Sequence, residues 1–270
     1  MNAPVRLAVL GDPLVYTLSP VLHRAGLEAL GIDGSSEALR TPLEQLGARL
    51  AALEVAGYRG VNLTHPLKHA VLDHLHQVSE PARAARSVNT LSFDSHGRIG
   101  DTTDGDGFMD WLATLRRDAE AERAVLLGAG GAARSVALAL ASRGARVVAA
   151  ARRAAAVLHD WRAIPGAEIV AWPSRELDAA LSDATLVVNA TPVSDVERPV
   201  PIERLPRRAL IVDLTYGSAL TPWIRSARAQ GVLAYDGLGM LVGQARRSLG
   251  VWFGTPPPFG ALARAVGWPR

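Results

Sequence analysis

The chain has 270 residues, of which 49% are hydrophobic and 20% charged, and its formal net charge is +3. This length accommodates one or two globular domains, and scattered arginines without a long basic run argue against a nucleic-acid-binding protein. There is no cysteine, which excludes disulfides, thiolate catalysis and a cysteine-ligated zinc. A signal-peptide pattern and an apolar run near the ~20 residues of a membrane span are also absent, so we expect a cytoplasmic protein with no membrane partner.

The first part of the chain alternates short apolar runs with helical patterns, which is typical of an α/β domain. Ser19 followed by Pro20 predicts a helix that begins with a capping hydroxyl. The expected strands are 6–10 and 60–64, the expected helices are 19–30, 42–56 and 68–76, and the expected hairpin joins 88–93 to 98–99.

The pattern changes after a connecting helix over 106–117. Four buried-type strands, expected at 124–127, 146–150, 186–189 and 210–213, are spaced by helices and predict a doubly wound sheet. A last helical segment, 237–249, is expected to return to the first domain. The sequence therefore predicts a two-domain α/β fold: residues 1–104 completed by 238–270, and a Rossmann-type dinucleotide-binding domain over 105–237.

A glycine loop opens the helix after the first of these strands. Its residues are Gly128, Ala129, Gly130, Gly131 and Ala132. Glycines let the backbone approach a pyrophosphate whose charge the helix N-terminus attracts, although a tight turn without a ligand gives a similar pattern.

The second strand of this domain ends at two cationic side chains, Arg152 and Arg153. An NAD site usually places Asp or Glu there to hold the ribose 2′-hydroxyl, whereas guanidinium groups favour a 2′-phosphate. The sequence therefore favours NADP(H) as the cofactor over NAD. The alternative is that one arginine is simply a solvated strand end.

Two residues of the first domain have the chemistry for proton transfer. Lys68 and Asp104 lie in polar segments, 62–68 and 100–105, and a buried Lys–Asp pair passes a proton to and from an alcohol. Combined with a dinucleotide site, this pair predicts a dehydrogenase. The alternatives are a solvated lysine at a helix start and an aspartate that caps the following helix.

Histidines are frequent in the first hundred residues, but their spacing does not predict a metal site. His65 and His69 are four apart with no third ligand nearby in sequence. We expect these side chains at the surface or at the edge of a cleft, together with His23, His74 and His76.

Seven ordered segments resemble the shikimate dehydrogenases and their quinate/shikimate dehydrogenase relatives. These segments are 11–23, 62–68, 87–90, 100–105, 128–131, 189–192 and 236–244. The resemblance implies NADP-linked, reversible reduction of 3-dehydroshikimate to shikimate on the chorismate route of aromatic amino-acid biosynthesis, by a monomer or homodimer. It also implies that the first domain binds substrate, that Lys68 donates and accepts the proton, and that Asp104 binds a ring hydroxyl group and orients the Lys68 ammonium group.

The same resemblance implies the remaining site residues. Substrate contacts fall on Thr17, Ser19, Asn62, Thr64, Asn89, Tyr216 and Gln244; cofactor contacts fall on the glycine loop, Arg152, Arg153, Thr191 and Gly237. The sequence departs from the family pattern at Thr17, Tyr16, His65 and Ala156, and it lacks a glycine after Pro192. Two alternatives stay open: a quinate/shikimate dehydrogenase of broader preference, and a non-catalytic paralogue that binds shikimate-like acids.

Overall fold

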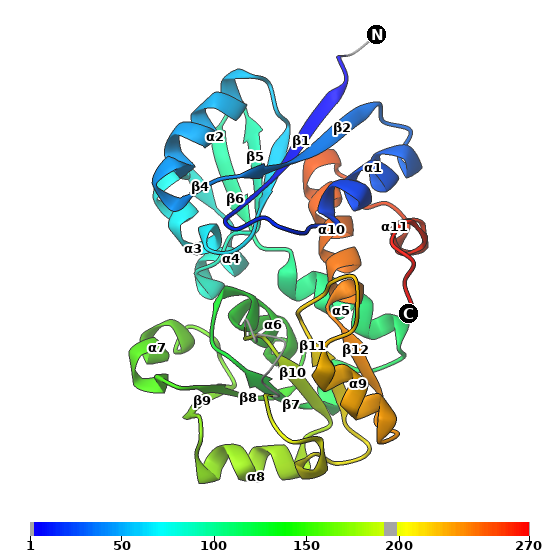
Figure 1. The fold of residues 1–270 in the computed structure, drawn as a ribbon. Coiled ribbons are helices and arrows are strands. Elements are labelled where there is room, and N and C mark those ends of the chain that lie inside the picture. Colours follow the sequence, from blue (N-terminus) through cyan, green and yellow to red (C-terminus); the bar gives the residue numbers. More distant parts are fainter. Residues whose placement is uncertain (1–2, 192–198, 270) are drawn as a thin grey trace. The chain divides into compact units, whose positions relative to one another are not determined.

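The computed structural model describes residues 3–191 and 199–269, and the chain divides into two compact units (Figure 1). Unit 1 comprises residues 1–107 and 241–270, and unit 2 comprises residues 108–240. The two boundaries fall inside helices α5 (Asp104–Thr114) and α10 (Leu238–Phe253). Across the described ranges, no helix is long and apolar enough to span a membrane.

Unit 1 is built on a six-stranded mixed sheet with the order β2-β1-β3-β5-β6-β4. The strands are β1 (Val5–Gly11), β2 (Gly34–Arg40), β3 (Gly60–Leu63), β4 (Gln77–Val78), β5 (Thr90–Asp94) and β6 (Gly97–Asp101). β1 pairs in parallel with β2 and β3, whereas β5 is antiparallel to β3 and β6. The predicted hairpin is therefore confirmed as β5–β6, and the two edge strands, β2 and β4, were not predicted.

Helices cover this sheet on both sides (Figure 1). Besides parts of α5 and α10 they are α1 (Ser19–Ala29), α2 (Leu46–Val55), α3 (Leu67–Ala70), α4 (Glu80–Ala85) and α11 (Phe259–Ala265), with short 3-10 helices at Leu43–Gln45 and Val71–His74. The single helices expected at 42–56 and 68–76 are thus each divided. Ser19 is not the helix cap: Leu18 occupies that position and Ser19 begins the helix.

Apolar and polar side chains alternate along β3, so the strand places different residues on the two faces of the unit 1 sheet. Val61 and Leu63 belong to the apolar cluster that also contains Leu46 and Leu50 of α2. Because successive side chains of a strand point to opposite faces, Asn62 points the other way, where it contacts side chains of α1 and α10. The strand therefore delivers a polar side chain to the face opposite its apolar core.

Unit 2 has a six-stranded, all-parallel sheet with the order β12-β11-β10-β7-β8-β9. Its strands are β7 (Arg123–Leu127), β8 (Arg146–Ala151), β9 (Ala167–Ala171), β10 (Leu186–Asn189), β11 (Leu210–Asp213) and β12 (Ala234–Asp236). This is the doubly wound order, with the switch point between β7 and β10. The predicted sheet is confirmed, and the two edge strands were not predicted.

The helices of unit 2 follow its strands in the right-handed α/β manner. They are α6 (Gly131–Ala141), α7 (Ala154–Trp161), α8 (Arg175–Asp183) and α9 (Pro222–Ala229), with 3-10 helices at Ala119–Ala121 and Ile202–Arg204. Ser174 and Thr221 cap α8 and α9 by accepting backbone N–H bonds. Leu177, Leu181 and Ile224 then bury these helices against the sheet.

Candidate active site

Most of the predicted substrate residues of unit 1 lie at one end of its strands, where β1 and β3 have their carboxyl ends. Thr64 follows the end of β3, which is parallel to β1, and the loop that follows the end of β1 contains Thr17 and leads to Ser19, the first residue of α1. The antiparallel strand β5 starts at that same end, directly after Asn89, and β6 ends there shortly before Asp104. Residues far apart in the sequence therefore lie near one another because of strand order.

Lys68 and Asp104 form an ion pair at this end of the strands. Lys68 Nζ donates to Asp104 Oδ2 over 2.6 Å. The aspartate side chain is 1% exposed and the lysine side chain 21%, so the lysine is the more accessible partner of the pair. An ammonium group has three protons, and the bond to Asp104 uses one of them.

Lys68 is the only lysine of the chain. The other 28 of its 29 basic Lys and Arg residues are arginines. A guanidinium group keeps its proton at all ordinary pH values, whereas a lysine amine can release one. The single lysine of the chain thus stands at the position for which proton exchange is predicted, and the composition alone carried this signal.

The second oxygen of the Asp104 carboxylate is also held. Asn89 Nδ2 donates to Asp104 Oδ1 over 2.8 Å, and the same amide group contacts Thr103 Oγ1 and Gln244 Oε1, each at 2.9 Å. The backbone N–H of Thr103 in turn donates to Asn89 Oδ1 over 2.7 Å. A buried carboxylate is costly unless it is paired and hydrogen-bonded, and both conditions are met here.

Asn62 lies behind this pair, with 6% of the residue exposed. Its amide nitrogen is 2.8 Å from the carbonyl oxygen of Asn89 and 3.0 Å from the hydroxyl groups of Thr90 and Ser248. Its carbonyl oxygen contacts the ring of His23 over 2.8 Å. The substrate contact that the resemblance implies for Asn62 stays a prediction, and these four contacts engage both ends of the amide within the protein.

His23 is fully buried, so the expectation that it lies at the surface is wrong. It is on the inner side of α1, where its ring meets Trp252 edge-on, with the ring centroids 5.4 Å apart. His65, His69 and His76 are exposed, as predicted. In the part of the chain that the structure describes, no group of three or more His, Asp and Glu side chains is arranged to hold a metal ion.

Thr17 and Ser19 are joined locally. The backbone N–H of Ser19 donates to Thr17 Oγ1 over 3.2 Å, and Ser19 is 5% exposed. Thr64 is partly exposed, and its backbone N–H is bonded to the carbonyl oxygen of Leu10. Of the departures from the family pattern, Tyr16 is 49% exposed, whereas the position of the missing glycine after Pro192 lies outside the described residues.

The glycine loop of unit 2 lies at the carboxyl end of β7. Gly128 has a φ of +111°, a value that L side chains rarely adopt. Gly130 caps α6, and a Cβ atom built there meets nothing within 4 Å. Open space beside a helix N-terminus suits a pyrophosphate, so this loop fits the dinucleotide that the sequence predicts.

Arg152 and Arg153 follow the end of β8, and both are exposed. No acidic residue accompanies them at the strand end, which reads Ala149–Ala151. Neither guanidinium group has a side-chain partner in the described part of the chain. Two available cations at this strand end suit a ribose 2′-phosphate better than a 2′-hydroxyl.

Hydrogen bonds connect the ends of β10 and β11, close in sequence to the predicted residues Thr191 and Tyr216. Asp213 accepts from Asn189 Nδ2 over 3.0 Å and from Thr221 Oγ1 over 2.9 Å, and burial raises the pKa of its carboxyl group. Thr191 donates from its hydroxyl group to Asn189 Oδ1 over 2.6 Å. Tyr216 follows Asp213 and is partly exposed, and Gly237 follows β12.

Motif reading overlooked Arg134, which holds the glycine loop from within α6. Its guanidinium group donates to the carbonyl oxygen of Ala129 over 3.1 Å and lies 3.4 Å from the carboxylate of Asp160 on α7. The arginine side chain is only 7% exposed. The sequence carried no local signal for this role, because Arg134 in α6 and Asp160 in α7 are far apart in the sequence and become neighbours only when the domain folds.

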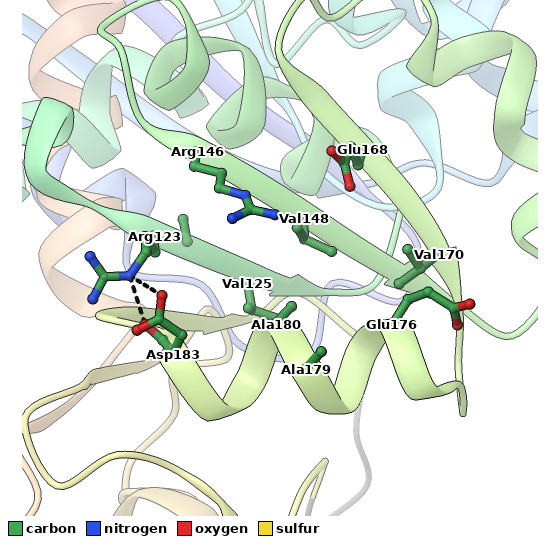
Figure 2. Close-up of a pocket in the computed structure, with 11 residues that line it drawn as sticks. Arg123, Val125, Arg146, Val148, Glu168, Val170, Glu176, Ala179, Ala180 and Asp183 are labelled. Atoms are coloured by element: carbon green, nitrogen blue, oxygen red, sulfur yellow. Dashed lines mark hydrogen bonds and ion pairs between the residues drawn. The ribbon is translucent and has the colours of Figure 1, made fainter.

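Unit 2 also has a surface hollow of about 380 Å³ that contains none of the predicted residues. Figure 2 shows it between α8 and the sheet, with Arg123 paired to Asp183. Its arginines, Arg123 and Arg146, stand at the first residues of β7 and β8. Ligands of doubly wound sheets bind at the carboxyl ends of the strands, so the hollow is not the expected dinucleotide site.

Comparison with known proteins covers both units. Residues 9–91 match the family described as the shikimate dehydrogenase substrate binding domain, and residues 237–266 match the shikimate 5'-dehydrogenase C-terminal domain. The chain is 39% identical to shikimate dehydrogenase (NADP(+)) from Acidiphilium cryptum, over 98% of this chain and 97% of that protein. It is 40% identical to the enzyme of the same name from Thermus thermophilus, over 97% and 99%.

Solved structures agree with these sequence matches. The crystal structure of shikimate 5-dehydrogenase from Thermus thermophilus in complex with NADP(H) and shikimate superimposes with a TM-score of 0.87 at 37% identity, covering 97% of this chain and 98% of that one. Ligand-free 5-ketofructose reductase of a Gluconobacter strain has a TM-score of 0.83 at 26% identity, with 98% of each chain covered.

Proposed function

The chain belongs to the shikimate dehydrogenase family, and we propose that it catalyses the NADP-dependent, reversible reduction of 3-dehydroshikimate to shikimate in aromatic amino-acid biosynthesis. The observation that carries the proposal is the Lys68–Asp104 pair, in which the only lysine of the chain contacts a buried carboxylate. Family relatives named shikimate dehydrogenase (NADP(+)) at 39–40% identity support the same reaction.

Lys68 performs the proton transfer. NADPH, when bound, would supply a hydride to the ketone carbon, which would leave negative charge on the ketone oxygen. The Lys68 ammonium group donates a proton to that oxygen, and in the reverse direction the amine accepts the proton of the hydroxyl group. Asp104 fixes the ammonium group, and the partial exposure of Lys68 lets solvent restore its proton.

Neutral polar groups recognise the rest of the substrate. Thr17 and Ser19 bind its carboxylate. Thr64, Asn89 and Gln244 bind ring hydroxyl groups, because hydroxyl and amide side chains supply directed bonds to such rings. The family resemblance also assigns Asn62 to these hydroxyl groups, although contacts within the protein engage both ends of its amide. Tyr216 of unit 2 is assigned to the substrate as well, on the family resemblance.

The proposed cofactor residues all belong to unit 2. The glycine loop with Ala129 and Ala132 receives the pyrophosphate, Arg152 and Arg153 bind the 2′-phosphate, and Thr191 and Gly237 line the nicotinamide side. We accordingly assign substrate binding to residues 1–104 with 238–270, and cofactor binding to residues 105–237. A cytoplasmic location and a monomer or homodimer complete the proposal; light scattering of the purified protein measures the oligomeric state.

The test is steady-state kinetics of the purified chain with shikimate and NADP. Lys68→Ala is expected to lower kcat by about 10²–10⁴-fold, the usual contribution of a general acid–base group, while shikimate still binds. Lys68→Arg is the matched control, because it keeps the charge but cannot release the proton. Wild-type turnover in either variant contradicts the mechanism.

The competing functions are separated by the same assay. A quinate/shikimate dehydrogenase gives a higher kcat/KM for quinate with NAD, and a ligand-binding paralogue binds shikimate without turnover. 5-Ketofructose belongs in the substrate panel as well, because a reductase of that sugar shares the fold and a fold alone does not decide the substrate.

A further inference from the structure

We infer that His23 is a positioning residue for the Lys68–Asp104 pair, and that Asn62 transmits its effect as part of the scaffold rather than as a substrate contact. The inference rests on the proposed function, since it concerns the geometry of the same proton transfer. His23 itself has no contact with Lys68 or Asp104, so its influence passes through other side chains.

The hydrogen bonds fix the orientation of the Asn62 amide and the tautomer of His23. The backbone carbonyl oxygen of Asn89 can only accept, so the Asn62 atom 2.8 Å from it must be the amide nitrogen. The Asn62 carbonyl oxygen then faces His23 Nε2 over 2.8 Å, and Nε2 must carry the proton. His23 Nδ1 is left to accept from the hydroxyl group of Ser36, also 2.8 Å away.

Burial keeps this arrangement in a single protonation state. His23 has no exposed surface, and its described neighbours are the uncharged side chains of Ser36, Asn62 and Trp252. Desolvation lowers the pKa of His23 to about 4, so the ring is neutral near pH 7. In the opposite tautomer, the Nε2 lone pair would face the Asn62 carbonyl oxygen, and a buried acceptor would be left without a donor.

Asn62 connects the histidine to the reacting group in three steps. Its amide group holds the Asn89 carbonyl oxygen, the Asn89 side chain holds Asp104 Oδ1 over 2.8 Å, and Asp104 Oδ2 holds Lys68 over 2.6 Å. Asn62 also donates to Ser248 of α10, four residues after Gln244. Misplacement of a catalytic group by about 1 Å costs on the order of 100-fold in rate, so a loosened Asn62 is expected to reach kcat.

Two amide substitutions that place the donor nitrogen at different positions test the role of the Nε2 proton. In His23→Gln the amide nitrogen reaches the position of Nε2 and can donate to Asn62, whereas in His23→Asn it reaches only the position of Nδ1. Both variants lose the aromatic ring. We expect kcat of His23→Gln to stay within about threefold of wild type and kcat of His23→Asn to fall by about tenfold or more, with KM for NADP unchanged in both.

Equal kcat values for the two variants overturn the inference, as does a loss confined to KM for NADP. If either variant fails to fold, nitrogen NMR of the wild-type histidine rings decides. A neutral His23 protonated at Nε2 supports the inference, and one protonated at Nδ1 refutes it. Absence of wild-type turnover with shikimate would instead reject the proposed function, and the NMR result would still stand by itself.

Discussion

Acidification is expected to destabilise this protein through one buried imidazole group. A His23 pKa that is 6.5 in the unfolded chain and about 4 in the folded protein corresponds, at ~1.4 kcal/mol for each pKa unit, to a loss on the order of 3 kcal/mol. The perturbation is a pH series from 7 to 4. The assay is urea unfolding at each pH, which gives the free energy of unfolding.

The sign follows from proton uptake. Between pH 6.5 and about 4 the unfolded chain binds a proton at residue 23 and the folded chain does not. Acid therefore favours the unfolded state, and the stabilisation, complete above pH 6.5, is lost as the pH falls toward 4. The raised pKa of Asp213 acts in the opposite direction, so the wild-type curve alone does not isolate His23.

His23→Gln provides the isolating control, because it retains Asp213 and every other titrating group. The wild-type free energy of unfolding should fall more steeply with acid than that of the variant, by on the order of 3 kcal/mol over the whole interval. Parallel curves for the two proteins would refute the reasoning, since they would mean that His23 takes up its proton equally well in the folded and the unfolded chain.

Three further outcomes concern other parts of the chain. Replacing Arg152 and Arg153 with Ala should raise KM for NADP at least about tenfold, the value of a charge-assisted bond, and leave KM for NAD nearly unchanged. Arg134→Met should raise KM for NADP several-fold, with KM for shikimate unaffected, because the glycine loop loses its support. Gly243→Ala should destabilise the protein by about 1–3 kcal/mol, measured by urea unfolding, since its Cβ atom would lie 2.0 Å from a backbone oxygen of α5. Gly260→Ala, which meets only a flexible side chain at 3.4 Å, is the neutral control.

Local sequence patterns were sufficient to predict those elements whose own residues carry a clear apolar or turn signal. The four apolar strands of unit 2 and the β5–β6 hairpin could be predicted because their periodicity and turns are local signals. β2 could not, since only Ala38 and Leu39 are apolar among its seven residues. It is a strand because parallel pairing with β1 satisfies its backbone hydrogen-bonding groups. Such pairing depends on a distant strand and cannot be predicted from the seven residues alone.

The site divides in the same way. Lys68 and Asp104 were predicted from motifs, but the 2.6 Å contact between them depends on the order of β3, β5 and β6 in the sheet. His23 was predicted at the surface or at the edge of a cleft, because the spacing of the histidines did not indicate a metal site. Its partner Asn62 is 39 positions away in the sequence. His23 is in α1 and Asn62 is in β3, with β2 between them in the chain, and the periodicity of a single segment does not predict a contact between two such elements.

The single lysine also makes this protein unusual to handle chemically. Amine-directed reagents, whether fluorescent esters, cross-linkers or activated resins, find only Lys68 and the α-amino group as targets. On the proposed mechanism, coupling through the Lys68 side chain would therefore immobilise the protein and inactivate it in the same reaction. On the proposed mechanism, the extent of Lys68 labelling would report occupancy of the substrate position, with the α-amino group as the other labelled amine.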